Sequence, residues 1–298
     1  MNASPPLFAN AMPDRNAPRF GVFVTPYNDP PRHAVELAKH AEQVGLDLVT
    51  FQDHPYQPRF HDTVALLAWT GAETERIRLA SAVHVLPLRR PAVLAKQAAT
   101  IDLLSGGRFE LGLGAGGFWD AIEAMGGPRR TPGEAVAALD EAIDVIRGLW
   151  DTESRERLEA GGQHYRVSGA KRGPAPAHDM EIWVGAYGPK MMGLIGRKAD
   201  GWLPSIGRVP FDELRERARQ LDEAAVAAGR SPAEIRRIAN LGLGESAFDP
   251  GRLADLIVAL ARELRFSTFT LATDDPAVIE AYATLVAPRA RAEIGVNP

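Results

Sequence analysis

The sequence contains no cysteine among its 298 residues. This absence excludes disulfide bonds, thiolate metal sites and thiol nucleophiles. The chain also lacks an apolar run long enough to span a bilayer, and its first residues do not combine a charged segment with an apolar one, as a signal peptide does. We therefore expect a cytoplasmic protein with no membrane partner.

An excess of positive charge is missing as well. Lysine and arginine number 34 against 38 acidic residues, which gives a formal net charge of −4. Because a polyanion partner requires a basic face, nucleic acid is not an expected partner. Metal-binding patterns are absent too: there is no His-Glu-x-x-His, no clustered histidine triad and no calcium loop. We expect no metal site.

What is present is a regular alternation of strand and helix signals. Eight such strands in strict alternation with helices favour a (β/α)8 TIM barrel over an open sheet. That fold usually takes about 250 residues, so some length remains for insertions. The predicted strands are Phe20–Thr25, Leu46–Gln52, Arg78–Val83, Arg108–Leu113, Glu181–Gly185, Gly201–Pro204, Ile235–Leu241 and Phe266–Ala272.

Several helix ends are marked by their residues. Pro91 begins a helix that Gly106 ends, and Thr131-Pro132-Gly133-Glu134 is a capping box with proline at the first helical position. Asp249-Pro250 and Asp275-Pro276 predict two further helix starts. Gly45 is placed to close the first helix.

The chain divides into a short arm and one folded unit. Residues 1–18 are rich in Asn, Pro and Ala and predict a flexible N-terminal arm, while residues 19–298 form a single barrel domain. Residues 151–179 are too long for an ordinary connection. We expect them to be an insertion between the fourth helix and the fifth strand that folds over the mouth of the barrel as a lid.

In a barrel of this kind the reactive groups follow the strands, at the carboxyl-terminal face. Asp53-His54 follows the second strand, and His84 follows the third. A histidine beside a carboxylate can transfer a proton with its tautomer fixed by its neighbours, so His54 is the predicted catalytic residue. His84 is a second candidate that lines the pocket.

Two glycine loops follow the fourth and fifth strands. Gly114, Ala115, Gly116 and Gly117 lie in a G-x-G-x-x-G run, but a Rossmann domain carries that fingerprint after its first strand. The run is either a nest of N–H groups for a phosphate, or a turn where only glycine packs, or both. Gly185-Ala186-Tyr187-Gly188-Pro189-Lys190 opens into a helix at Met191, which is either an anion site or a turn beside a solvated lysine.

The pair Arg89-Arg90 leaves two interpretations open. These side chains either meet a phosphate or form an ordinary exposed charge pair.

Taken together, these motifs resemble the luciferase-like, flavin-dependent oxidoreductases from about Phe20 to Gly207. The resemblance implies a barrel that binds coenzyme F420 or FMN at its carboxyl-terminal mouth. It places His54 near the ring, Asp53 against the cofactor and a cis peptide at Ala82–Val83 behind the ring. It assigns the ring edge, ribityl chain and phosphate to Gly114–Gly117 and Gly185–Lys190. The residues that carry it are Asp53-His54, Arg76–Val83, Arg90–Ala92, Ala95-Lys96, Asp102–Gly117, Leu149-Trp150, Gly185–Lys190, Gly196 and Asp200–Trp202.

Two features depart from the sugar-phosphate dehydrogenases of the deazaflavin branch. Those enzymes carry an acidic pair just after the fourth-strand glycines, where this chain has Gly117-Phe118. Their aromatic residue after the Asp-His loop is only approximated by Tyr56 and Phe60. A more apolar or bulkier substrate, met by Phe118, Trp119 and Tyr187, fits the sequence better.

The expected function is therefore hydride transfer between reduced coenzyme F420 and a small organic substrate. One alternative is an FMN-dependent monooxygenase that uses oxygen and a partner flavin reductase. A second is a flavin-binding protein without catalysis, and a third is a lyase or isomerase barrel for a phosphorylated substrate. The resemblance also makes a homodimer an expectation.

Overall fold

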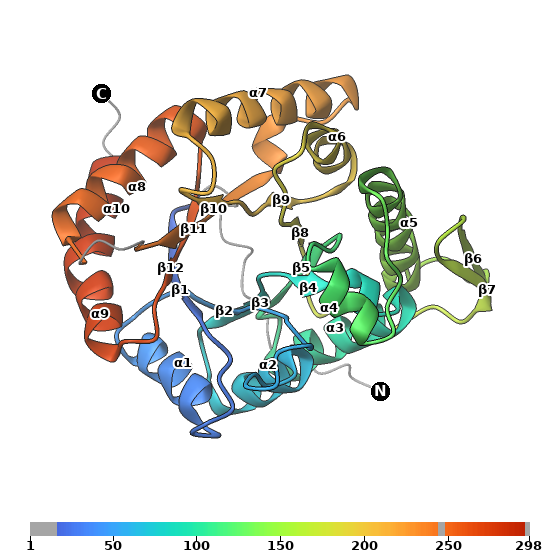
Figure 1. The fold of residues 1–298 in the computed structure, drawn as a ribbon, viewed down its shortest axis with the longest axis horizontal. Coiled ribbons are helices and arrows are strands. Elements are labelled where there is room, and N and C mark those ends of the chain that lie inside the picture. The colour runs from blue at the N-terminus through green and yellow to red at the C-terminus, as the bar shows by residue number, and fades with distance from the viewer. Residues whose placement is uncertain (1–16, 244–247, 296–298) are drawn as a thin grey trace, which may run out of the picture.

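A ring of parallel strands surrounded by helices makes up the protein, as a computed structural model shows for residues 17–243 and 248–295 (Figure 1). The strands pair in the order β10-β11-β12-β1-β2-β3-β5-β8-β9, and β9 pairs with β11 to close the ring. The predicted (β/α)8 barrel is confirmed. Residues 1–16 of the predicted arm lie outside the described residues. Among the described residues, no helix is long and apolar enough to cross a membrane.

Each barrel strand lies close to its predicted position. The strands are β1 (Arg19–Val24), β2 (Leu48–Phe51), β3 (Arg78–Ser81), β4 (His84–Val85), β5 (Phe109–Gly114), β8 (Ile182–Val184), β9 (Gly201–Trp202), β10 (Ser205–Ile206), β11 (Arg236–Gly242) and β12 (Thr268–Ala272). The predicted third strand is interrupted, because β3 ends at Ser81 and pairing resumes only at β4. The peptide bond between Ala82 and Val83 is cis, as expected.

The helices surround the strands in chain order. They are α1 (His33–Gln43), α2 (Thr63–Glu73), η1 (Leu86–Leu88), α3 (Pro91–Ser105), α4 (Trp119–Ala124), α5 (Pro132–Trp150), α6 (Pro189–Lys198), α7 (Phe211–Ala227), η2 (Pro232–Glu234), α8 (Pro250–Leu264), α9 (Pro276–Ala281), η3 (Tyr282–Val286) and α10 (Ala287–Gly295). The predicted caps are present: Thr131 and Glu134 form the capping box of α5, and Gly106 ends α3 with a φ of 71°.

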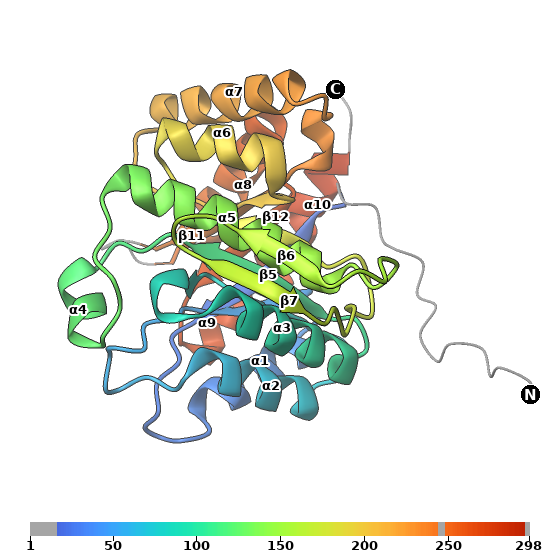
Figure 2. The same ribbon diagram turned by 90° about the vertical axis from the view of Figure 1, so that its right-hand side faces the viewer.

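The segment between α5 and β8 contains an antiparallel hairpin of β6 (Leu158–Gly161) and β7 (Arg166–Ala170). This hairpin packs along the outer side of α5 (Figures 1 and 2). Glu141 on α5 accepts hydrogen bonds from the backbone N–H groups of Gln163, His164 and Tyr165 at 2.8–2.9 Å. The expectation of a lid over the mouth is therefore wrong, because α5 holds the hairpin at the side of the barrel.

The core has two separate parts. The larger part lies between the strands and the helices and is made of aliphatic and aromatic side chains. The smaller part fills the inside of the barrel with Leu48, Ala80, Trp183, Leu203 and Ile238. The barrel is thus packed rather than hollow below its mouth, as is usual for this fold.

Charged side chains fill the amino-terminal end of the barrel. Arg236 donates from Nε to Glu181 Oε2 at 2.9 Å, and both residues are buried. Arg78 forms an ion pair with the buried Glu110. Because the charges of these two pairs are matched, the cost of removing them from water is offset.

His178, just before β8, contacts two buried carboxylates at this end of the barrel. Its Nδ1 lies 3.0 Å from the Asp102 carboxylate and its Nε2 lies 3.4 Å from Glu110 Oε1. Asp102 is fully buried and also accepts the backbone N–H of Ala177 at 2.7 Å. Burial alone lowers the pKa of His178, but the hydrogen bonds to Asp102 and Glu110 outweigh it and raise the pKa to about 9.

We expect this histidine to make stability depend on pH in the alkaline range. A pKa raised in the folded state adds stability that is complete below the unfolded value near 6.5 and is lost as the pH rises through about 9. A His178→Gln variant should therefore be less stable than the parent by up to about 3 kcal/mol at pH 6. Urea unfolding at pH 6 and pH 10 measures this difference, which should shrink at pH 10.

The matched control is His33→Gln, at the start of α1 and away from this cluster. This control should change the free energy of unfolding by less than about 0.5 kcal/mol. A loss of stability in His178→Gln that did not change between pH 6 and pH 10 would contradict the assignment.

Candidate active site

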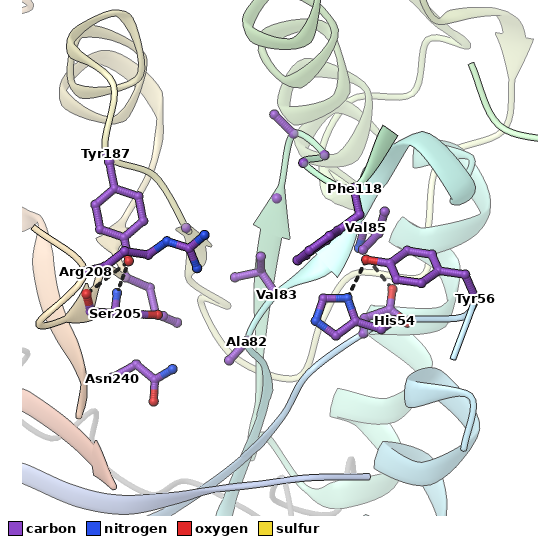
Figure 3. Close-up of a pocket in the computed structure, with 17 residues that line it drawn as sticks. His54, Tyr56, Ala82, Val83, Val85, Phe118, Tyr187, Ser205, Arg208 and Asn240 are labelled. Carbon is purple, nitrogen blue, oxygen red and sulfur yellow. Dashed lines mark hydrogen bonds between the residues drawn. The ribbon is translucent and has the colours of Figure 1, made fainter. Parts of the chain in front are cut away.

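A pocket opens at the carboxyl-terminal mouth of the barrel (Figure 3). Its lining comes from segments that follow β2, β3, β5, β8, β9 and from the end of β11, so residues far apart in sequence meet there. Ten of the predicted site residues line it: Asp53, His54, Ala82, Val83, Gly114, Ala115, Gly116, Gly117, Gly185 and Tyr187.

Four predicted site residues do not line this pocket. His84 is buried behind it and faces Asp53. Ala186 is buried and its carbonyl accepts the Trp202 indole N–H at 2.9 Å. Gly188 and Lys190 are exposed, because α6 begins at Pro189 rather than at Met191 and its first turn faces solvent.

Asp53 is the buried anchor of the site. Its Oδ1 accepts Arg89 Nη2 at 2.7 Å, and its Oδ2 accepts Arg89 Nε at 3.1 Å and the Val85 backbone N–H at 3.0 Å. His84 Nδ1 lies 3.3 Å from Oδ2. Burial raises the pKa of Asp53, but the hydrogen bonds from His84 and Arg89 outweigh it and hold the pKa well below its usual range. The carboxylate is ionised at neutral pH.

The same contacts answer the question about Arg89-Arg90. Arg89 is held on Asp53 by a bidentate pair and on Asp62 at 2.8 Å. Its charge is therefore matched by two carboxylates, which leaves Arg90 as the free member of the pair within the described structure.

His54 projects from the loop after β2 into the pocket (Figure 3). Its Nδ1 lies 2.6 Å from the Tyr56 hydroxyl, so Nε2 is the ring nitrogen on the pocket side. Burial lowers the pKa of His54, and the negative charge of Asp53 opposes this only in part. The imidazole is thus neutral at pH 7. Burial, aided by Asp53, raises the pKa of Tyr56 to about 12, so the phenol stays protonated.

Aromatic rings surround this histidine. Phe118 meets the His54 ring edge to face with centroids 5.4 Å apart, and Tyr56 lies 5.3 Å away. Phe60 lies 6.5 Å from the His54 ring on another side. Tyr56 and Phe60, which sequence reasoning regarded as offset, both approach His54. The surroundings explain the lowered pKa, because apolar rings stabilise the uncharged imidazole.

The floor of the pocket is the Val83 side chain, and three glycines leave room for it. A Cβ at Gly114 would lie 2.6 Å from Val83 Cγ2, and one at Gly185 would lie 3.2 Å from the same methyl. A Cβ at Gly112 would lie 3.2 Å from Cγ1 and 1.9 Å from the Ser81 carbonyl oxygen. The close-packing explanation of these glycines therefore holds for Gly112 and Gly114.

Sequence reasoning missed the polar side of the pocket. Arg208 and Asn240 line it opposite His54, next to Ser205 (Figure 3). The Tyr187 hydroxyl accepts the Ser205 backbone N–H at 2.6 Å, which ties the fifth and sixth strand ends together. A signal for Asn240 existed, since Arg236, Ile238 and Asn240 alternate along β11 and share a face. No comparable pattern marked Arg208, which lies in a loop.

Comparisons with known proteins bear on the family and the fold. The sequence profile of the luciferase-like monooxygenase family matches residues 14–243. An F420-dependent glucose-6-phosphate dehydrogenase from Nocardia farcinica is 35% identical over 217 residues. These residues cover 70% of this chain and 63% of that protein, so the chain spans slightly less than two thirds of that relative's length.

Two solved structures share the fold. A coenzyme F420-dependent tetrahydromethanopterin reductase from Methanopyrus kandleri superimposes with a TM-score of 0.71 at 18% identity, covering 91% of this chain and 99% of that one. The oxygenating constituent of 3,6-diketocamphane monooxygenase from Pseudomonas putida, solved with FMN, gives 0.72 at 20% identity, covering 91% and 98%. Because the profile matches most of its length, the chain belongs to the luciferase-like monooxygenase family.

The close approach of Val83 predicts that Gly114 does not tolerate a larger side chain. A Gly114→Ala substitution should displace Val83 and destabilise the protein by about 1–3 kcal/mol, since an added methyl in a packed site forces its neighbours to move. Gly117→Ala is the matched control, because a Cβ there has no neighbour within 4 Å, and it should change stability by less than about 0.5 kcal/mol. Urea unfolding measures both.

A double variant separates this contact from other causes. Removing the Val83 methyls in Gly114→Ala/Val83→Ala should recover much of the stability lost in Gly114→Ala alone. Equal losses at positions 114 and 117 would show that the approach of Val83 does not explain the glycine.

Proposed function

We propose that this protein is an oxidoreductase that transfers hydride between reduced coenzyme F420 and a small, largely apolar organic substrate. The observation that carries the proposal is the neutral His54, hydrogen-bonded to Tyr56, facing the polar side of one pocket above the Val83 floor. The name of the Nocardia farcinica relative, an F420-dependent dehydrogenase, supports the choice of cofactor.

The pocket suits a flat heteroaromatic ring. Val83, Val85 and Leu203 offer apolar surface for a ring face, while Ser205 and Asn240 offer hydrogen-bonding groups for a ring edge. Gly116 and Gly117 are exposed beside this surface and present no side chain that would block it. Arg208 supplies a positive charge at the rim that suits the phosphate of such a cofactor.

The chain would hold the cofactor through Val83, the glycines at 114–117 and 185, Ser205, Arg208 and Asn240. A bound deazaflavin supplies two-electron hydride chemistry, while the protein supplies placement, electrostatics and exclusion of water. His54 would accept or donate the accompanying proton at Nε2, because Nδ1 is engaged by Tyr56. Phe118 and Tyr56 would cover the proton-transfer site with apolar surface.

The aromatic surroundings of His54 also favour an apolar substrate. Phe118 stands where the sugar-phosphate dehydrogenases carry an acidic residue, and 58% of its surface is exposed at the pocket. Such a ring favours a hydrocarbon surface over a sugar hydroxyl, because an unpaired polar group pressed against it would lose hydration. The proposed substrate is therefore more apolar than the glucose 6-phosphate in the name of the Nocardia farcinica relative.

The first test is a fluorescence titration of the purified protein with coenzyme F420 and, separately, with FMN. Micromolar affinity for the deazaflavin and much weaker affinity for FMN would support the proposal. Preference for FMN would favour a monooxygenase that works with oxygen and a partner flavin reductase. If neither cofactor binds, the proposed function fails and the alternative of a barrel for a phosphorylated substrate returns.

The second test concerns His54. A His54→Ala variant should lose turnover by roughly 100-fold or more while it binds cofactor with nearly parental affinity, because a general acid–base contributes about that much. If the neutral imidazole accepts the proton, kcat should fall only as the pH drops below the lowered pKa of His54, that is, below 6.5. This acid limb should vanish in His54→Ala.

The matched control is His61→Ala, since the His61 ring contacts a backbone carbonyl outside the pocket. It should leave turnover and the pH profile unchanged. Parental turnover in His54→Ala, with bound cofactor, would remove His54 from the mechanism.

A further inference from the structure

We infer that a second cavity, beside the mouth of the barrel, binds a small oxyanion such as phosphate or a carboxylate. The cavity lies between η1, the loop at 125–130 that follows α4, and the tip of the β6–β7 hairpin. The residues that give it its character are Arg90, Arg130, His164 and Tyr165, and we name it the oxyanion cavity. It shares no lining residue with the mouth pocket, so this inference does not rest on the proposed function.

The strongest evidence is that Arg130 is buried and has no ion-pair partner among the described residues. Only 8% of its surface is exposed, yet no carboxylate of the described residues lies within ion-pair distance of it. Among the described residues, the hydrogen bond of its guanidinium runs from Nη1 to the Tyr165 hydroxyl at 3.2 Å, and the guanidinium lies 5.1 Å from the centre of the Tyr165 ring. A guanidinium carries five N–H donors, so most of this group is left to bind something else.

The two other buried arginines are paired differently. Arg236 is held by Glu181, and Arg237 forms an ion pair with Asp222. A buried charge normally requires such a partner, because the loss of hydration is costly. Arg130 departs from this pattern at a position that lines a cavity, which indicates that its counter-charge comes from outside the chain.

The neighbouring charges favour an anion. Arg90 is exposed at the cavity with no ion pair among the described residues, and His164 also lines the cavity. Glu134 is an acidic neighbour, and the charges of Arg130 and His164 contribute to lowering its pKa, after the hydrogen bonds from Thr131. Its Oε2 already accepts the Thr131 backbone N–H and hydroxyl at 2.8 Å each. Glu141 is a second acidic neighbour, and its carboxylate already accepts the backbone N–H groups of Gln163, His164 and Tyr165. With both carboxylates engaged in this way, Arg130 and Arg90 are the charges that remain for a ligand.

The geometry also restricts the kind of anion. Tyr165 positions Arg130 through the cation–π contact and the hydrogen bond to Nη1, and it donates its own hydroxyl to the Leu86 carbonyl at 3.2 Å. A fixed guanidinium beside a second arginine suits an oxyanion with two or more oxygens, such as phosphate or a carboxylate, better than a halide. Since Leu86 belongs to η1 and Tyr165 to the hairpin tip, a bound oxyanion would hold these two segments together.

The test is binding of inorganic phosphate to the full chain. We expect phosphate to raise the melting temperature of the parent beyond the effect of sodium chloride at equal ionic strength, and to give a measurable Kd by calorimetry. Arg130→Gln should weaken phosphate binding at least tenfold, because it removes the buried charge. Arg129→Gln is the matched control, since Arg129 is exposed and pairs with Asp120 and Glu123 outside the cavity. It should bind phosphate as the parent does.

Two further variants keep the test decisive if Arg130→Gln folds poorly by circular dichroism. Arg130→Lys keeps the charge but not the planar fork, and Arg90→Gln removes the exposed partner, so each should weaken phosphate severalfold. No phosphate effect beyond ionic strength in the parent, or equal binding by the position 129 and 130 variants, would overturn the inference.

A titration of coenzyme F420 identifies the source of the oxyanion. Unchanged cofactor affinity in Arg130→Gln, together with lost phosphate binding, would show that the cavity takes a free anion. A parallel loss of both affinities would support the site and assign it to the phosphate of the cofactor. A failure of the proposed function would appear instead as no binding of F420 by the parent, with phosphate binding intact.

Discussion

The geometry of the mouth depends on one buried carboxylate. Asp53 follows the second barrel strand, and its two oxygens bind groups of the next unit: the Arg89 guanidinium, the Val85 backbone N–H and the His84 ring. The chain between β3 and η1 is thereby fixed relative to the loop that carries His54. Val83 lies within this fixed segment and His54 next to the anchor, so the distance between pocket floor and pocket wall follows from the Asp53 contacts.

This arrangement assigns different tasks to adjacent residues. Asp53 remains charged because strong donors surround it, while the neighbouring His54 remains neutral because aromatic rings surround it. The contrast shows how two neighbouring titratable groups are driven to opposite protonation behaviour by burial and partners alone. A charged anchor next to an uncharged imidazole is consistent with the proposed role of His54 in proton transfer.

Most of the fold could be predicted from the sequence because its signals are local. Strand alternation, the Thr131 capping box and the Gly106 helix end depend on residues within a few positions of each other, and the structure contains each of them. The path of the hairpin could not be predicted in this way. Its position depends on Glu141, which accepts three backbone N–H groups from residues more than 20 positions away. No sequence pattern predicts such a long-range contact.

In the site, too, residues marked by local signals could be predicted and residues placed by long-range contacts could not. Asp53, His54 and the glycines follow strand ends and were predictable from that rule, and ten of fourteen predicted residues line the pocket. Lys190 is not among them, because one proline moves the start of α6 and turns its first residues to solvent. Arg208 lies in a loop whose direction is set by tertiary contacts, so neither periodicity nor a motif could reveal it.

The two ends of the barrel also differ in what a substitution would change. Paired charges such as Arg236–Glu181 and the His178–Asp102 contact lie at the amino-terminal end, away from the pocket at the opposite rim. The buried charges of the amino-terminal end are therefore remote from the residues that line the pocket. A search for variants with a new substrate could therefore begin at an exposed rim side chain such as Phe118, which takes no part in the buried ion pairs of the amino-terminal end.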